Sequence, residues 1–146
     1  MKIEVFIENE GGSNQKHCFN EQTLEYIKTV TISRPYPYPY GLIPGTISGD
    51  GDNLDCFVIT SRSIKSRERV NVEPVGMMEQ FEDGENDHKI LAIFPEEEIN
   101  ITSEIQNSIA DFVTHAFEHL RGKKIKVGKF YGKEEAEQLI EQSRRG

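Results

Sequence analysis

The first half of the chain alternates between hydrophobic and polar positions, which is the pattern of β-strands with one buried face. In the segment 2–8, Ile3, Val5 and Ile7 fall on the same face, and a turn rich in glycine at 11–14 follows. The later runs have the same character or are short and continuously apolar. The pattern predicts strands over residues 2–8, 16–19, 26–32, 56–59, 70–78, 89–94 and 125–130.

From Ser103 onward the hydrophobic positions repeat at helical spacing. Ser103 and Gln106 fit a capping box at the start of this helix, and Gly122 is suited to end it. A second helix is predicted over 133–144. The hydrophobic stripe of the first helix consists of Ile105, Ile109, Phe112, Val113, Ala116, Phe117 and Leu120.

The order of elements, strands first and helices last, predicts an α+β, β-rich fold. The simplest such architecture is a small β-barrel flanked by the C-terminal helices. At 146 residues the chain is expected to form a single domain spanning 1–146, because neither a linker nor an internal repeat divides the sequence.

Composition adds an acidic character to this picture. The chain is 36% hydrophobic and 29% charged, and 17 basic against 25 acidic residues give a formal charge of −8. There is no block of clustered Lys and Arg, as nucleic-acid binding would require, and no apolar run approaches the roughly 18 residues of a membrane span. Cys18 and Cys56 are too few for a disulfide framework or a zinc site. We therefore expect a reduced, cytoplasmic protein that binds neither nucleic acid nor membrane.

One short stretch places Asp50, Asp52 and Asp55 around a glycine, directly before a predicted strand. Oxygen ligands suit Mg²⁺, Mn²⁺ or Ca²⁺, and a tight turn lets nonadjacent aspartates converge. An EF-hand loop is excluded, because Leu54 stands where that loop requires an oxygen ligand and Ser61 stands where it requires a glutamate. The stretch therefore predicts a site for a hard cation.

A second acidic cluster precedes the apolar strand that begins at Lys89. Each cluster taken alone is also typical of a solvated loop between strands. Together with Lys16, Lys28 and the tyrosines, the two clusters favour a site where several divalent cations hold a phosphate chain and a carboxylate takes a proton from water. The second cluster consists of Glu79, Glu82, Asp83, Glu85 and Asp87.

The segment 36–55 resembles the signature region of the soluble family I inorganic pyrophosphatases. It contains Y-P-Y-P-Y-G at 36–41 and D-G-D-N-L-D at 50–55, and the resemblance runs from Glu8 through most of the chain. The resemblance implies a small OB-like β-barrel with the site at the barrel mouth. It also implies Mg²⁺-dependent hydrolysis of pyrophosphate to two phosphates without a covalent intermediate.

The resemblance implies roles for individual residues. Asp52 resembles the carboxylate that receives a proton from the metal-activated water. The expected metal site consists of Asp50, Asp55, Asp87, Glu82 and Glu8. The expected substrate-binding and supporting residues are Lys16, Lys28, Tyr40, Lys89 and Tyr36. The expected cofactor is Mg²⁺, with Mn²⁺ as a substitute and Ca²⁺ as an inhibitor, and bacterial family members imply a homo-oligomer, commonly a hexamer.

The sequence departs from the family pattern mainly among the groups that contact phosphate. Lys28 stands in place of an arginine and lacks its bidentate fork. Cys18 replaces an acidic residue, and Glu82 replaces an aspartate. A Tyr-Lys pair on the family's penultimate helix is replaced by Ala116 and Phe117. The expected metal-binding residues are therefore kept, whereas several groups that bind phosphate in the family are missing or changed.

This asymmetry leaves three functions open. The first is a Mg²⁺-dependent pyrophosphatase with weakened or rearranged anion contacts. The second is a hydrolase of another phosphate anhydride such as a nucleotide, in which Ala116 and Phe117 line a pocket for an apolar or aromatic group. The third is a homologue that binds metal or an anion without turnover.

Overall fold

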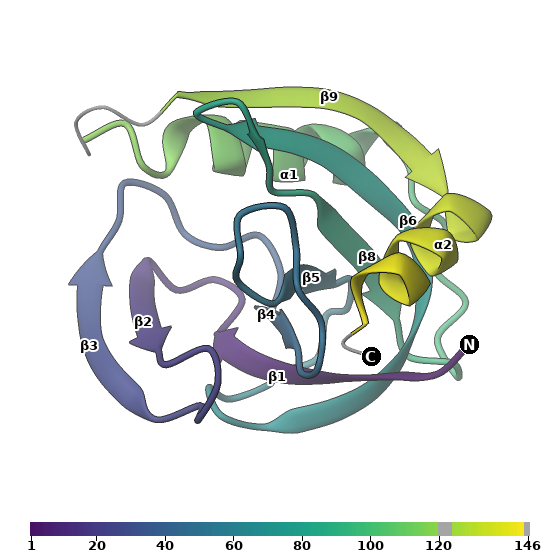
Figure 1. The fold of residues 1–146 in the computed structure, drawn as a ribbon, viewed down its shortest axis with the longest axis horizontal. Coiled ribbons are helices and arrows are strands. Elements are labelled where there is room, and N and C mark those ends of the chain that lie inside the picture. Colours follow the sequence, from purple (N-terminus) through teal and green to yellow (C-terminus); the bar gives the residue numbers. More distant parts are fainter. Residues whose placement is uncertain (120–123, 145–146) are drawn as a thin grey trace.

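The computed structural model describes residues 1–119 and 124–144, which form a β-rich body with two helices near the C-terminus (Figure 1). The elements are β1 (Ile3–Asn9), β2 (Gln15–Phe19), β3 (Tyr26–Thr31), β4 (Tyr40–Ile43), β5 (Leu54–Val58), β6 (Arg69–Glu82), β7 (Glu85–Asn86), β8 (Lys89–Ile93), α1 (Ser103–His115), β9 (Ile125–Gly132) and α2 (Lys133–Ser143).

The main sheet closes into a barrel. Strands β1, β4, β5, β8 and β6 follow one another, and β6 pairs back onto β1. At 14 residues, β6 is long enough to pair with β1 at its start and with β8, β9 and β7 further along. Strands β2 and β3 form a separate two-stranded sheet beside the barrel (Figure 1). This architecture confirms the predicted α+β fold with an OB-like barrel and C-terminal helices.

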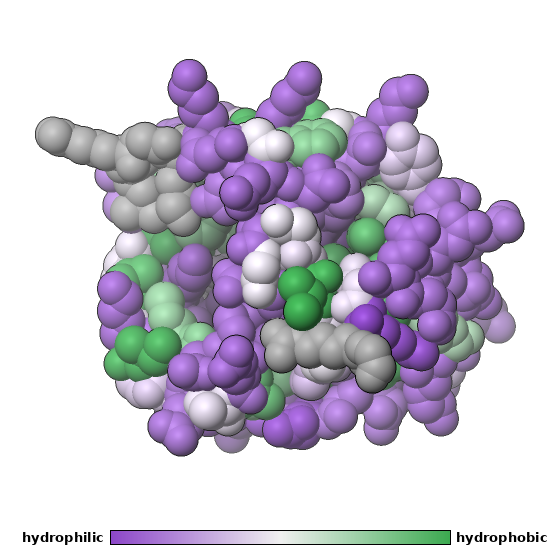
Figure 2. Space-filling view, in the orientation of Figure 1, coloured by the Kyte–Doolittle hydropathy of each residue, from purple (hydrophilic) through white to green (hydrophobic). Residues whose placement is uncertain are grey.

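Polar residues cover most of the face drawn in Figure 2, and the apolar groups on it are small and separate. Among the described residues, the large hydrophobic side chains that are exposed are Tyr26, Ile27, Ile47 and Tyr131. No helix within residues 1–119 and 124–144 has both the length and the apolar character needed to cross a membrane.

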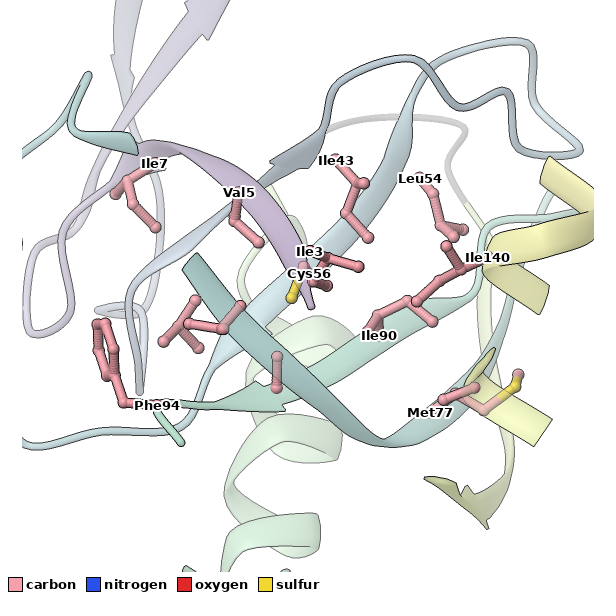
Figure 3. Close-up of a cluster of buried hydrophobic side chains, with 14 of the residues drawn as sticks. Ile3, Val5, Ile7, Ile43, Leu54, Cys56, Met77, Ile90, Phe94 and Ile140 are labelled. Carbon is pink, nitrogen blue, oxygen red and sulfur yellow. The ribbon is translucent and has the colours of Figure 1, made fainter. Parts of the chain in front are cut away.

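The side chains that point into the barrel form one hydrophobic core (Figure 3). Alternation along β5 sends Cys56 and Val58 into this core, whereas Phe57 and Ile59 point to the opposite side. Ile140 of α2 reaches into the core from outside the sheet (Figure 3). The barrel therefore has no open interior, and any pocket has to lie outside this core.

A second core fills the space between the outer face of the barrel and α1. Ile109 and Phe112 of α1 belong to it, together with Phe57 and Leu91 from the barrel strands. Strand β8 is consequently buried along its whole length. This double burial explains why the segment 90–94 is apolar without alternation.

All the predicted strands are present, but the prediction misses β4 and β7. The prediction also ends β6 too early, at residue 78 instead of Glu82, because the acidic residues that follow are typical of a loop. The segment 80–82 pairs with β9 and continues the strand. This extension lacks the hydrophobic alternation of a core strand, because Gln80 and Glu82 line a pocket instead of the core.

The N-cap of α1 differs by one residue from the prediction, whereas α2 begins at Lys133 as predicted and ends one residue early, at Ser143. The N-cap of α1 is Thr102 rather than Ser103, because the Thr102 hydroxyl accepts a hydrogen bond from the Ile105 N–H at 3.3 Å. Helix α2 begins where the Gly132 N–H donates to the Glu135 carboxylate at 3.0 Å.

The end of α1 corrects the prediction more strongly. The helix ends at His115, and turns follow it. The Ser33 N–H donates to the Ala116 carbonyl oxygen at 3.0 Å, so this carbonyl is satisfied from outside the helix. Phe117 therefore lies beyond the helix. The predicted stop at Gly122 lies outside the described residues.

The close approach of β1 and β4 requires a glycine in the Y-P-Y-P-Y-G segment. A Cβ on Gly41 would lie 1.9 Å from the Phe6 carbonyl oxygen. We expect Gly41→Ala to lower the free energy of unfolding by about 3 kcal/mol, because one strand has to move. Urea denaturation measures this, with Gly132→Ala as the control, where the nearest contact to a Cβ is 3.6 Å. An unchanged midpoint for Gly41→Ala would contradict the expected clash.

Candidate active site

A pocket of about 190 Å³ gathers side chains from distant parts of the chain. Lys28 is absent from its lining, because this residue lies exposed on β3, opposite Cys18 of β2. The acidic side chains that were predicted and line the pocket are Glu8, Asp50, Asp52, Asp55, Glu82 and Asp87. The other predicted residues in the lining are Lys16, Tyr36, Tyr40 and Lys89.

Hydrogen bonds within one tight turn fix the first aspartate of the D-G-D-N-L-D stretch. The Ser48 N–H donates to the Asp52 carbonyl oxygen at 2.7 Å, and the Gly51 N–H donates to that of Ser48 at 3.0 Å. Gly51 has a φ of 89°, in the left-handed region that favours glycine. The Asp50 carboxylate accepts the Ser48 hydroxyl and, at 3.1 Å, the Asp52 N–H. The turn therefore fixes the Asp50 carboxylate, and both Asp50 and Asp52 line the pocket.

Lys89 is the buried cation at the centre of the site. Asp55 and Lys89 are register partners on the parallel strands β5 and β8. The Lys89 ammonium lies 2.7 Å from Asp55 Oδ2 and 3.1 Å from Asp87 Oδ2, and it donates to the Tyr40 hydroxyl at 3.0 Å. Burial opposes this charge, but the carboxylates of Asp55 and Asp87 outweigh burial and raise the pKa of Lys89.

The two predicted tyrosines are buried behind these charges. Tyr36 and Tyr40 have ring centroids 5.3 Å apart, and Tyr36 also lies 4.5 Å from the ring of Phe112. The Tyr36 hydroxyl accepts a hydrogen bond from the Asn9 amide at 3.1 Å. Burial raises the pKa of both tyrosines, with further contributions from nearby carboxylates. Both hydroxyls therefore remain protonated and retain a proton to donate.

Asp50, Glu82 and Asp87 have the arrangement of a cation site. One carboxylate oxygen from each lies within 4.8 Å of the others. Gln80 is buried beside them, donates from Nε2 to Asp87 at 3.4 Å, and has an Oε1 without a hydrogen-bond partner among the described residues. A buried oxygen without a partner is costly unless something binds it. Carboxylate and amide oxygens are the ligands of hard divalent cations, so the donor set fits such a metal.

Asp52 lies at the exposed end of the turn. Partial burial raises the pKa of its carboxyl, and the neighbouring carboxylates of Asp50, Asp55 and Glu82 raise it further. A carboxylate in such a negative environment has an increased affinity for a proton. This property suits a group that accepts a proton during a reaction.

Ala116 and Phe117 replace the Tyr-Lys pair of the family pattern, and of these two residues only Phe117 lines the pocket. Phe117 belongs to the lining, whereas Ala116 is buried in the second core. The predicted wall of Ala116 and Phe117 is therefore wrong for Ala116. The Lys16 ammonium lies 4.9 Å from the centroid of the Phe117 ring, a cation–π contact. The aromatic ring thus holds a cation at the side of the pocket where the family pattern has a Tyr-Lys pair.

Glu21 is a pocket residue that the sequence analysis misses. Its carboxylate accepts the Asn53 N–H at 2.9 Å, and its carbonyl oxygen accepts the Asn53 side-chain amide at 2.6 Å. These bonds attach the loop after β2 to the D-G-D-N-L-D turn. The local sequence around Glu21 is that of an ordinary polar turn. The available signal is its position shortly after Cys18, where the family pattern has an acidic residue.

The free energy of unfolding of the metal-free protein should depend on the charge of Glu21. Burial, together with Asp55 and Asp52, raises the pKa of Glu21 from 4.5 to about 7. Because the folded value is the higher one, this contribution is complete below pH 4.5 and is lost as the pH rises through 7. Between pH 5 and 8 in EDTA, we expect wild type to lose about 1 kcal/mol more than Glu21→Gln, allowing for solvent screening. Urea denaturation at both pH values tests this, and identical losses would contradict it.

A β-barrel with carboxylates that can hold cations, next to lysines and tyrosine hydroxyls that can bind an anion, defines a metal-dependent enzyme of phosphate chemistry. The family described as inorganic pyrophosphatase matches residues 5–145. The chain belongs to this family of hydrolases.

Relatives from several lineages share this similarity. The inorganic pyrophosphatase of Nanoarchaeum equitans is 35% identical over 153 residues, which cover 98% of this chain and 96% of the relative. The inorganic pyrophosphatase of Halalkalibacterium halodurans is 30% identical over 149 residues, covering 96% and 91%. The solved inorganic pyrophosphatase of Coxiella burnetii is similar with a TM-score of 0.87 at 26% identity, covering 97% of this chain and 92% of that chain.

Proposed function

We propose that this protein hydrolyses inorganic pyrophosphate to two phosphates in the cytoplasm, with Mg²⁺ as its cofactor. The observation that carries the proposal is that the lining of one pocket contains a group of carboxylates together with Lys16 and Lys89. Membership in the inorganic pyrophosphatase family supports the same substrate. Mn²⁺ is proposed as a substitute, because it shares the preference for oxygen ligands.

The proposed metal-binding residues are Asp50, Asp55, Asp87, Glu82 and Glu8. Divalent cations bound there would neutralise the oxyanions of pyrophosphate and lower the pKa of water. Asp50, Glu82 and Asp87 already have oxygens within 4.8 Å of one another. Lys89 holds the Asp55 and Asp87 carboxylates in position from below the pocket surface.

Asp52 is proposed to accept the proton of the attacking water. The water oxygen forms a bond to one phosphorus, the bridging P–O bond breaks, and the second phosphate leaves. Lys16 neutralises phosphate oxygens. Lys89 holds Asp55 and Asp87 and donates to the Tyr40 hydroxyl, which is thereby left to donate a hydrogen bond to a phosphate oxygen. Tyr36 supports Tyr40 by ring contact. Lys28 has no role in this assignment, because it does not line the pocket.

The decisive experiment is phosphate release from pyrophosphate at millimolar Mg²⁺, with EDTA as the control. We expect turnover that EDTA abolishes. Ca²⁺ should inhibit, since its longer metal–oxygen distances and flexible geometry fit a Mg²⁺ reaction poorly. Parallel reactions with ATP and nucleoside diphosphates test the other substrates. Release from a nucleotide but not from pyrophosphate, or equal rates with Ca²⁺ and Mg²⁺, would contradict the proposal.

We also propose that the protein is a homo-oligomer, and specifically a hexamer. Support comes from its resemblance to bacterial members of the family. Light scattering of the purified protein measures the mass of the assembly. A mass of 16.7 kDa, that of one chain, would contradict a homo-oligomer, and any mass other than six times this value would contradict the hexamer.

A further inference from the structure

Gln80 is held rigidly at the inner wall of the pocket. Its backbone N–H donates to His88 Nδ1 at 3.1 Å, and its carbonyl oxygen accepts the Asp87 N–H at 2.8 Å. These two bonds fasten the residue to the segment that leads into β8. Its side chain is 3% exposed and lines the pocket. The side chain therefore has little freedom to find partners elsewhere.

Within the part of the chain that the structure describes, the amide nitrogen of the Gln80 side chain has a hydrogen-bond partner and the amide oxygen has none. Nε2 donates to Asp87 Oδ2 at 3.4 Å, which sets the orientation of the amide. The reverse orientation would direct an amide oxygen at a carboxylate. Oε1 is left without a hydrogen-bond partner among residues 1–119 and 124–144. An apolar side chain would fill this place without that cost, so a buried amide oxygen at this position calls for a ligand.

We propose that Gln80 is a further residue of the cation site of Asp50, Glu82 and Asp87, and that its Oε1 supplies the cation with a neutral oxygen. The inference rests on the metal dependence within the proposed function. Gln80 projects from the same face of β6 as Glu82, two positions along the strand, and contacts Asp87 directly.

A neutral oxygen has a specific advantage here. Asp50, Glu82 and Asp87 bring three carboxylates together, and these repel one another when no cation is bound. A further carboxylate would strengthen this repulsion in the metal-free protein. An amide oxygen adds a ligand without adding charge, and ligand number and charge together set the affinity for a divalent cation.

The test compares Mn²⁺ affinity, by isothermal titration calorimetry, with the stability of the metal-free protein in EDTA. Gln80→Met removes Oε1 while keeping the approximate volume. We expect its Mn²⁺ affinity to fall about 10- to 100-fold. Its metal-free midpoint in urea should stay close to that of wild type, since removal of the unsatisfied buried oxygen offsets the loss of the 3.4 Å hydrogen bond from Nε2 to Asp87. Gln138→Met, at an exposed position of α2, is the matched control and should change neither value.

Gln80→Glu differs in both expectations and covers the case in which Gln80→Met does not fold. Its carboxylate keeps an oxygen near the cation, so Mn²⁺ should bind at least as tightly as to wild type. The metal-free midpoint should fall, because the new charge faces Asp87. Wild-type Mn²⁺ affinity in Gln80→Met, or equal losses of affinity in both variants, would overturn the proposal. Neither titration requires turnover, so a failure to hydrolyse pyrophosphate would refute the proposed function without deciding this inference.

Discussion

Asp52→Asn is expected to lower kcat for pyrophosphate hydrolysis by about 10²- to 10⁴-fold, the range for loss of a positioned general base. The asparagine amide has nearly the same shape but cannot take up the proton. Asp52 lies exposed and outside the group of Asp50, Glu82 and Asp87. The affinity for Mn²⁺ and the free energy of unfolding should therefore stay close to those of wild type.

Steady-state kinetics at saturating Mg²⁺ and calorimetric titration with Mn²⁺ separate the two roles that Asp52 can have. Asp111→Asn is the matched control, because Asp111 is an exposed aspartate on α1 that pairs with Arg34 outside the pocket. Full activity in Asp52→Asn would remove the assigned base. A loss of kcat together with an equal loss of Mn²⁺ affinity would instead make Asp52 a metal ligand.

Two different signals made the strands predictable. Burial of one face imposes alternation, as along much of β6, whereas β5 and β8 are buried on both faces and are therefore short apolar runs. Strand β4 escapes this logic. The proline-rich segment before it removes the local signal, although Tyr40–Ile43 pairs with β1 and β5 on its two sides. The extension of β6 escapes for a different reason: Gln80 and Glu82 alternate toward a pocket, so both faces contain polar residues.

The end of α1 shows the limit of periodicity in another way. Apolar side chains continue at helical spacing past His115, because the turn after the helix also packs against the second core. The helix itself stops where Ser33 satisfies the Ala116 carbonyl. That contact joins residues far apart in the sequence, so no local pattern contains it. Phe117 follows directly after this point and lines the pocket.

The residues of the candidate site also differ in whether the local sequence can predict them. Asp50, Asp52 and Asp55 are predictable because one turn brings them together. Glu21 and Gln80 are not, because their importance depends on what the fold places beside them. A glutamate in a polar turn and a glutamine in an acidic segment each have an ordinary sequence context. Only tertiary structure shows the first bound to the D-G-D-N-L-D turn and the second with a buried oxygen that has no hydrogen-bond partner among the described residues.

Lys89→Met is expected to destabilise the metal-free protein by about 3–5 kcal/mol at pH 8, the cost of leaving buried charges without their partner. The side chains of Asp55 and Asp87 are 17% and 8% exposed and share this ammonium. Burial raises the pKa of Asp87, so without Lys89 its carboxyl becomes neutral more readily. The loss of stability should therefore be smaller at pH 5 than at pH 8, and smaller in Mg²⁺ than in EDTA.

Urea denaturation of wild type and Lys89→Met under these four conditions measures the effect. Lys129→Met, at an exposed position of β9, is the control and should lie within about 0.5 kcal/mol of wild type. The methionine keeps most of the length of the lysine stem, so a packing defect would cost the same at both pH values and with or without Mg²⁺. An equal loss under all four conditions would thus assign Lys89 to packing. A loss that protonation and Mg²⁺ both relieve would show that its charge stabilises the site until a cation takes over that role.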